Sequence, residues 1–164
     1  MNVENLCELY LTELRELRSV EDQLVTALPK MAQAARHPQL KQVIEAHLNE
    51  TRAQRDQLDG LLERHGADPG KHQDGSMQAI IKEAERWARQ VQDPECRDAG
   101  LIASAQRVVH YEIAVYGTLA TWAKQLNEEG DLTVLHAMLE EEKRTDEKLT
   151  ELAKSVINPE AAQA

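Results

Sequence analysis

Apolar residues recur every three or four positions along most of the chain, which is the spacing of one face of an α-helix. Long stretches of this pattern cover residues 3–28, 38–65 and 94–127, and a last stretch follows Gly130-Asp131 and reaches Val156. A shorter stretch, residues 76–92, lies between the second and third of these. The pattern predicts an all-α protein with four long amphipathic helices and one additional short helix.

Proline, glycine and asparagine mark the predicted helix ends. Pro29 predicts that the first helix ends or kinks there, with a short helical turn after it. Residues 67–75, rich in glycine and aspartate, are predicted to be a loop. Asn158-Pro159 is predicted to stop the last helix, which leaves residues 158–164 as a disordered tail.

The length and the connections predict a single bundle. A chain of 164 residues suits one domain, which we expect to cover residues 1–157. The short connection at Gly130-Asp131 makes the last two long helices an antiparallel hairpin, and the first two form another. The loop, short helix and loop between the hairpins are long enough to cross from one end of the bundle to the other. This layout predicts a ferritin-like antiparallel four-helix bundle with a long crossover that contains the additional short helix.

Each long helix carries an ionisable residue near its middle, on or beside its apolar face. Glu112 is the clearest case, because it lies at the centre of an apolar stripe that runs from Ile102 to Leu126. Burying a lone carboxylate costs several kcal/mol unless it is paired, protonated or bound to a metal. The other members of this group are Glu21 in the first helix, His47 and Glu50 in the second, and Glu142 and Asp146 in the last.

These six side chains suggest a metal site. Residues three or four positions apart share a helix face, so His47 with Glu50 and Glu142 with Asp146 could each present two ligands to one point. Five carboxylates close together repel one another, whereas two divalent cations would offset most of their charge. We therefore expect two metal ions at the centre of the bundle.

Simpler interpretations stay open at each position. A one-residue error in helical phase would move Glu21 or Glu142 to the surface. His47 could be a core histidine that a neighbour satisfies. Glu50 and Asp146 could support a ligand or pair with Lys or Arg instead of binding metal. Tyr116, one turn beyond Glu112, could hydrogen-bond a ligand, although packing in the core is its expected role.

Composition narrows the classes of function. With 29 acidic and 19 basic residues the net charge is −10, which argues against a nucleic-acid partner. No apolar run approaches membrane-spanning length and the N-terminus lacks a basic or apolar leader, so we expect a cytoplasmic protein with no membrane partner. Cys7 and Cys96 are not in a metal-binding spacing and are expected to be ordinary thiols.

Several segments resemble the YciE/YciF family of bacterial stress-response proteins, which belongs to the ferritin-like superfamily. The most specific segments are Val20–Leu24, Ala27–Met31, His47–Thr51, His110–Leu119, and Leu139–Lys143 with Asp146. The resemblance extends from Met1 to about Val156. It implies a fold similar to rubrerythrin-type di-iron proteins, a homodimer, and no firmly established activity.

The ligand pattern departs from that of most di-iron bundles. Those take Glu-x-x-His from two helices and one Glu from each of the others. Here the second helix has the reverse order, His47-x-x-Glu50, and the last helix has Glu142 with Asp146, so one nitrogen ligand remains. We expect Fe or Mn, while the oxygen-rich ligand set keeps Mg and Ca open and makes oxygen activation less expected than at a typical di-iron site.

Two functions follow from this reading. The first is a ferritin-like stress-response protein with a dinuclear di-iron or di-manganese site that removes peroxide or oxygen. The second is a non-enzymatic dimeric stress protein, in which a structural metal or a proton-sharing carboxylate cluster supports action through protein partners. Iron storage in a cage is disfavoured, because the additional helix interrupts the simple ferritin plan.

Overall fold

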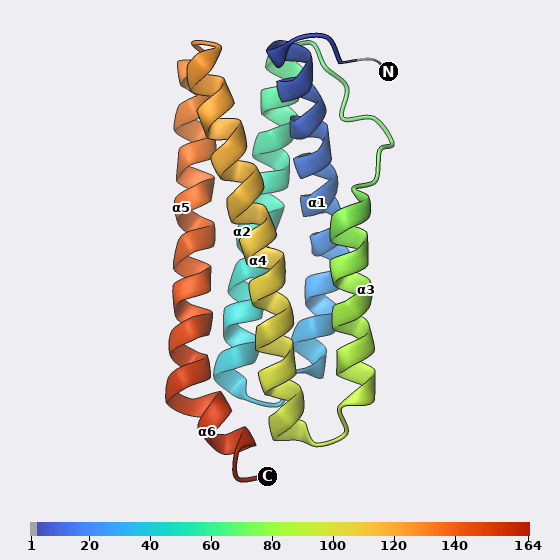
Figure 1. Ribbon diagram of the computed structural model, residues 1–164, viewed down its shortest axis with the longest axis vertical. Coiled ribbons are helices and arrows are strands. Elements are labelled where there is room, and N and C mark those ends of the chain that lie inside the picture. Colours follow the sequence, from blue (N-terminus) through green and yellow to red (C-terminus); the bar gives the residue numbers. More distant parts are fainter. Residues whose placement is uncertain (1–2) are drawn as a thin grey trace.

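The computed structural model describes residues 3–164 (Figure 1). Its long helices are α1 (Leu6–Ala34), α2 (Pro38–Arg64), α4 (Pro94–Gln125) and α5 (Glu129–Leu152). The shorter elements are α3 (Gly75–Gln90), a π-helical turn η1 (Ala153–Ile157) and α6 (Asn158–Ala161). Residues 3–164 contain no strand, and the prediction of an all-α helical bundle is confirmed.

The order of the helices in space follows from one long crossover. α1 and α2 form one antiparallel hairpin, α4 and α5 form the other, and α1 packs beside α4 while α2 packs beside α5. α3 leads the chain back along the bundle before α4 begins, so α2 and α4 run in the same direction and lie diagonally opposite (Figure 1). This is the expected ferritin-like layout.

The crossover helix covers only one side of the bundle. α3 packs against α1 and α4, with Met77 fully buried at that contact. Within the described residues no helix packs over the opposite side, where α2 and α5 meet. None of the helices between residues 3 and 164 combines the length and the apolarity needed to cross a membrane.

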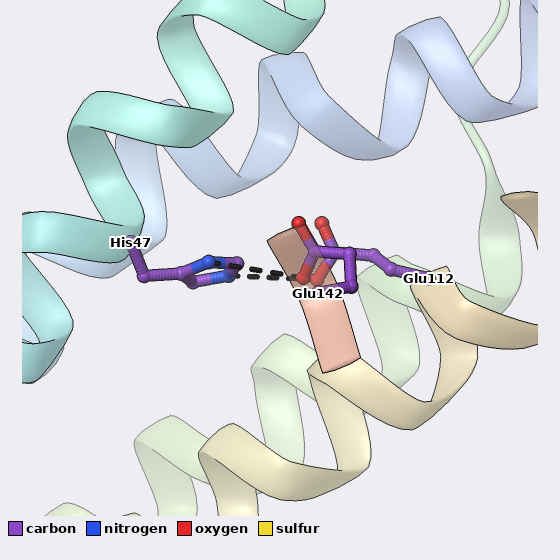
Figure 2. A group of neighbouring side chains, drawn as sticks. All are labelled: His47, Glu112 and Glu142. Carbon is purple, nitrogen blue, oxygen red and sulfur yellow. Dashed lines mark ion pairs between the residues drawn. The ribbon is translucent and has the colours of Figure 1, made fainter. Parts of the chain in front are cut away.

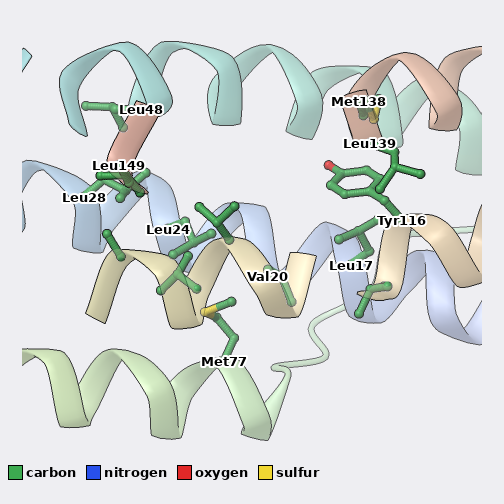
Figure 3. Packing of buried hydrophobic residues seen from close by; sticks show 14 of the residues in the cluster. Leu17, Val20, Leu24, Leu28, Leu48, Met77, Tyr116, Met138, Leu139 and Leu149 are labelled. Carbon is green, nitrogen blue, oxygen red and sulfur yellow. The ribbon is translucent and has the colours of Figure 1, made fainter. Parts of the chain in front are cut away.

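The apolar faces of the helices meet in one core along the length of the bundle. The stripe predicted in α4 is buried from Ile102 to Ala123. Figure 3 shows Leu28, Leu48 and Leu149 gathered at one level and Leu17, Met138 and Leu139 near Tyr116 at another. Because Glu21 lies between Leu17 and Leu28 along α1, these apolar layers flank the middle of the bundle on both sides.

Pro29 lies inside α1, so the prediction that the first helix ends there is wrong. Proline has no N–H to donate to the preceding turn, which normally weakens a helix interior. Pro29 and Lys30 face outward, whereas Ala27, Leu28 and Met31 on the inward face of the same turn are buried. Burial of this turn against the core outweighs the missing hydrogen bond, and the helix continues to Ala34.

The tight turn between α4 and α5 also differs from the prediction. It consists of Leu126, Asn127 and Glu128, with Asn127 at a φ of 61°, a left-handed conformation that asparagine tolerates better than most residues. Gly130 and Asp131 belong to the first turn of α5 instead.

The C-terminal end continues in helical form where we expected a disordered tail over residues 158–164. η1 widens the last turn of α5, and α6 follows it and packs against α4. Ile157 is 1 % exposed, and its burial anchors this end of the chain to the bundle.

A buried carboxylate holds the turn between α1 and α2. Asp98, in α4, is 1 % exposed and accepts hydrogen bonds from the backbone N–H groups of Arg36 and His37, each at 2.8 Å. These two groups follow the end of α1 and precede α2. The side chain of Asp98 therefore replaces the backbone partners that a continuing helix would have provided.

We predict that Asp98→Ala lowers the free energy of unfolding of the metal-free chain by about 2–3 kcal/mol, because it removes the shared acceptor of two charge-assisted hydrogen bonds from the backbone. Urea denaturation followed by circular dichroism measures the change. Glu95→Ala is the control, since Glu95 makes only a surface ion pair with Arg36 and its loss should cost less than about 1 kcal/mol. Equal losses in the two variants would contradict the assigned role of Asp98.

Candidate metal centre

Four of the predicted residues meet at the middle of the bundle, one from each long helix. His47 Nε2 lies 3.5 Å from Glu112 Oε2, and His47 Nδ1 lies 3.8 Å from Glu142 Oε2 (Figure 2). Glu21 approaches Glu112 from α1. We refer to Glu21, His47, Glu112 and Glu142 as the central cluster. Each occupies an inward position of its helix, so the helical period alone aims all four at one point.

Burial changes the acid–base behaviour of the cluster. No member is more than 3 % exposed. Burial raises the pKa of Glu112 to about 8. Burial and then the charge of Glu112 raise the pKa of Glu21 and of Glu142 well above the ordinary value. Without a counter-charge, the carboxyl groups therefore hold protons near neutral pH.

Several polar atoms of the cluster have no hydrogen-bond partner in the protein. They are Glu21 Oε2, both ring nitrogens of His47, both oxygens of Glu112, and Glu142 Oε2. Buried polar atoms are normally paired, because leaving one unpaired costs about 1–3 kcal/mol. Carboxylate oxygens and an imidazole nitrogen are ligands that Fe and Mn accept. The residues present therefore fit a divalent metal site.

Two buried side chains orient the cluster. The Tyr116 hydroxyl donates to Glu21 Oε1 at 2.6 Å, and Gln54 Nε2 donates to Glu142 Oε1 at 2.9 Å. Such partners fix the direction in which a ligand's free oxygen points. Tyr116 packs in the core as expected and also contacts a cluster member. Gln54 had no predicted role, although its position seven residues after His47 puts it on the same helix face.

The other two predicted ligands lie outside the central cluster. Glu50 is half-buried, and its Oε2 accepts a hydrogen bond from Thr145 Oγ1 at 3.2 Å. Asp146 Oδ1 accepts from Gln106 Nε2 at 3.0 Å and pairs with His110 Nε2 at 2.9 Å, where α4 meets α5. The structure thus brings four of the six predicted residues together.

A second group of ionisable residues lies at the C-terminal end of α2. Asp131 Oδ2 accepts from the Tyr10 hydroxyl and lies 2.7 Å from His65 Nε2, while Oδ1 pairs with Arg64 at 2.8 Å. Glu128 lies nearby. Because Asp131 already has three partners, and Arg64 offsets its charge, this group connects α1, α2 and α5 and is a poor metal site.

Comparison with known proteins assigns the chain to a family. Residues 5–162 match the family described as Domain of unknown function (DUF892). Protein YciF of Escherichia coli strain K12 is 41 % identical over 162 residues, covering 98 % of each chain. The crystal structure of the E. coli stress protein YciF matches with a TM-score of 0.91 and 39 % identity, over 95 % of this chain and 99 % of that one.

A second solved structure also has the same fold as this chain. YcfI from Rhodopseudomonas palustris matches with a TM-score of 0.88 and 36 % identity, over 91 % of this chain and 95 % of its own. The resemblance predicted from the sequence is confirmed by these matches, which cover nearly the whole chain. The protein belongs to the DUF892 family and is a relative of the bacterial stress protein YciF.

Proposed function

We propose that this DUF892 protein binds two divalent metal ions, Fe or Mn, at the centre of its bundle and acts as a ferritin-like stress-response protein. The observation that carries the proposal is the central cluster, whose buried ligand atoms have no partner in the protein. Glu21, His47, Glu112 and Glu142 would hold the ions. Glu50 is a further ligand within reach, because it lies one turn from His47 and its one hydrogen bond to a side chain comes from Thr145.

Charge balance supports two ions over one. Glu21, Glu50, Glu112 and Glu142 carry four negative charges when ionised, which two divalent cations would neutralise. Asp146 is left out of the proposed ligand set, because Gln106 and His110 already hold its carboxylate between α4 and α5. The resulting set has one nitrogen and is otherwise made of oxygens, as hard cations prefer.

Bound Fe or Mn would supply one-electron chemistry toward dioxygen or peroxide. The protein's own side chains would orient the metal ligands and enclose the site. Burial and the charge of Glu21 raise the pKa of Tyr116 well above its ordinary value, so its hydroxyl keeps its proton and holds Glu21 in place. Because no member of the cluster is more than 3 % exposed, the site is closed to larger substrates.

The same enclosure supports a second function without catalysis. A site closed to larger substrates suits a structural metal, or carboxyl groups that share protons, in a stress protein that acts through protein partners. The homodimer implied by the family resemblance belongs to this second function as well, and its surface stays a prediction.

We predict that protein purified without added metal contains about two Fe or Mn ions per chain, and that Glu112→Gln lowers this content at least about tenfold. Elemental analysis for Fe, Mn, Zn, Mg and Ca measures the content. Glu140→Gln is the matched control, since it removes the same charge from a residue of α5 that pairs with Lys143 near the surface. A metal-free protein that takes up none on reconstitution would overturn the proposal.

The pH dependence of stability should depend on metal. In excess chelator, the folded state binds the proton of Glu112 more tightly than the unfolded state, because the pKa rises from an ordinary value of 4.5 to about 8 on folding. The metal-free chain should therefore lose several kcal/mol of stability as pH rises from about 5 to about 8. Melting temperatures at these pH values measure the loss.

Metal should reverse this trend, since the cations bind the ionised carboxylates and stabilise the folded state increasingly as pH rises. Glu112→Gln should flatten the profile of the metal-free chain. Melting temperatures that do not change between pH 5 and pH 8 in chelator would contradict the assigned burial of ionisable carboxyl groups.

Peroxide turnover separates the catalytic function from the structural one. We predict that the chain loaded with Fe or Mn consumes hydrogen peroxide, and that Glu112→Gln does not. An oxygen electrode or a dye assay measures the consumption, with the same concentration of free metal as the control. Absence of turnover above that control, together with full metal occupancy, would favour the structural function.

A further inference from the structure

The side of the bundle opposite α3 carries polar residues at the level of the central cluster. We call this line of contact between α2 and α5 the α2–α5 seam. From α2 it receives Glu50, Thr51 and Gln54, and from α5 it receives Glu141 and Thr145. Within the described residues no helix lies over it. Polar side chains therefore extend from the surface of this seam to the buried centre.

Gln54 connects the surface to the centre in a single step. Its Nε2 donates to Glu141 Oε2 at 3.0 Å and to Glu142 Oε1 at 2.9 Å. Glu141 is half-exposed, Gln54 is 1 % exposed, and Glu142 belongs to the central cluster. One amide side chain therefore bridges a carboxylate at the surface and a carboxylate of the proposed metal site.

Unpartnered acceptor atoms continue along the seam. Gln54 Oε1 and Thr51 Oγ1 are buried and have no hydrogen-bond partner. Both are neutral oxygens, which bind a passing cation without holding it as strongly as a carboxylate does. One turn away from Gln54, the carboxylate of Glu50 faces Thr145 and adds a second negative charge at the outer part of the seam.

The other sides of the bundle are less suited to the entry of cations. Between α1 and α2, Arg18 and Arg55 pair with Asp22 and Arg18 also pairs with Asp59, which places guanidinium groups there. Between α4 and α5, Asp146 is held by His110 and Gln106.

α3 covers the α1–α4 side. By contrast, no Lys or Arg of the described chain forms an ion pair with Glu50 or Glu141. No cationic side chain of residues 3–164 therefore competes with a metal ion for these two carboxylates at the seam.

We propose that the α2–α5 seam is the route by which divalent cations reach the central cluster. Glu141 forms the outer capture point, Gln54 Oε1 and Thr51 Oγ1 are the intermediate contacts, and the proposed ligands Glu50, Glu142 and His47 receive the ion. This inference rests on the proposed metal-binding function and adds to it the direction and the residues of uptake.

The test is the rate at which the metal-free full chain takes up Co²⁺ added alone, followed by stopped-flow absorbance. Glu141→Gln should slow uptake about threefold and Glu141→Lys about tenfold, because the charge at the capture point sets the local cation concentration. Both variants should keep the wild-type amount of bound Co²⁺ at equilibrium. The difference from wild type should shrink as salt is raised.

Glu140→Gln and Glu140→Lys are the matched controls, because they make the same charge changes one residue away, where the carboxylate pairs with Lys143. Uptake by the Glu141 variants at the rate of the Glu140 variants would overturn the route and leave the metal site standing. A wild-type chain that binds no Co²⁺ at equilibrium would overturn the proposed function, and the route with it.

Discussion

The burial of three carboxyl groups around one imidazole is the constraint on which the rest of the structure depends. Glu21, Glu112 and Glu142 surround His47 with almost no exposure to water. Ionised carboxylates in such a place need counter-charge, and protonated ones need partners. The unpartnered oxygens and nitrogens at the centre are the atoms through which the proposed metal site would bind its cations, and apolar layers lie on either side of them.

The topology makes this polar centre compatible with a stable bundle. Buried aspartates fasten the ends: Asp98 holds the turn between α1 and α2, and Asp131 joins Tyr10 to the end of α2. The beginning of α3 is held in the same way, since Asp74 caps it and accepts from the Tyr111 hydroxyl. Rigid ends allow the middle to hold side chains that repel one another. The crossover shields one side only, and no helix of the described chain lies over the opposite α2–α5 seam.

Rules based on local sequence failed where packing was stronger than local preference. Pro29 predicts a helix end or a kink, yet the helix continues through it, with the nearby Leu28 and Met31 buried in the core. Gly130 predicts a turn, yet Asn127 takes the left-handed conformation three residues earlier and lets α5 begin sooner. At Pro29 the buried apolar area of the same turn contributes more free energy than the single backbone hydrogen bond that is missing.

The sequence by itself determined the helices, the bundle and the central position of Glu21, His47, Glu112 and Glu142, because the helical period is a local property and places these residues in the middle of the inward faces. Only the tertiary structure decided what happens at the edges of those faces. Glu50 and Asp146 lie beside the inward stripes, where the neighbouring helix determines which partner a side chain meets. Thr145 holds the first and Gln106 the second, whereas Gln54 reaches Glu142, because the pairing of α2 with α5 is a contact between distant parts of the chain that no local period encodes.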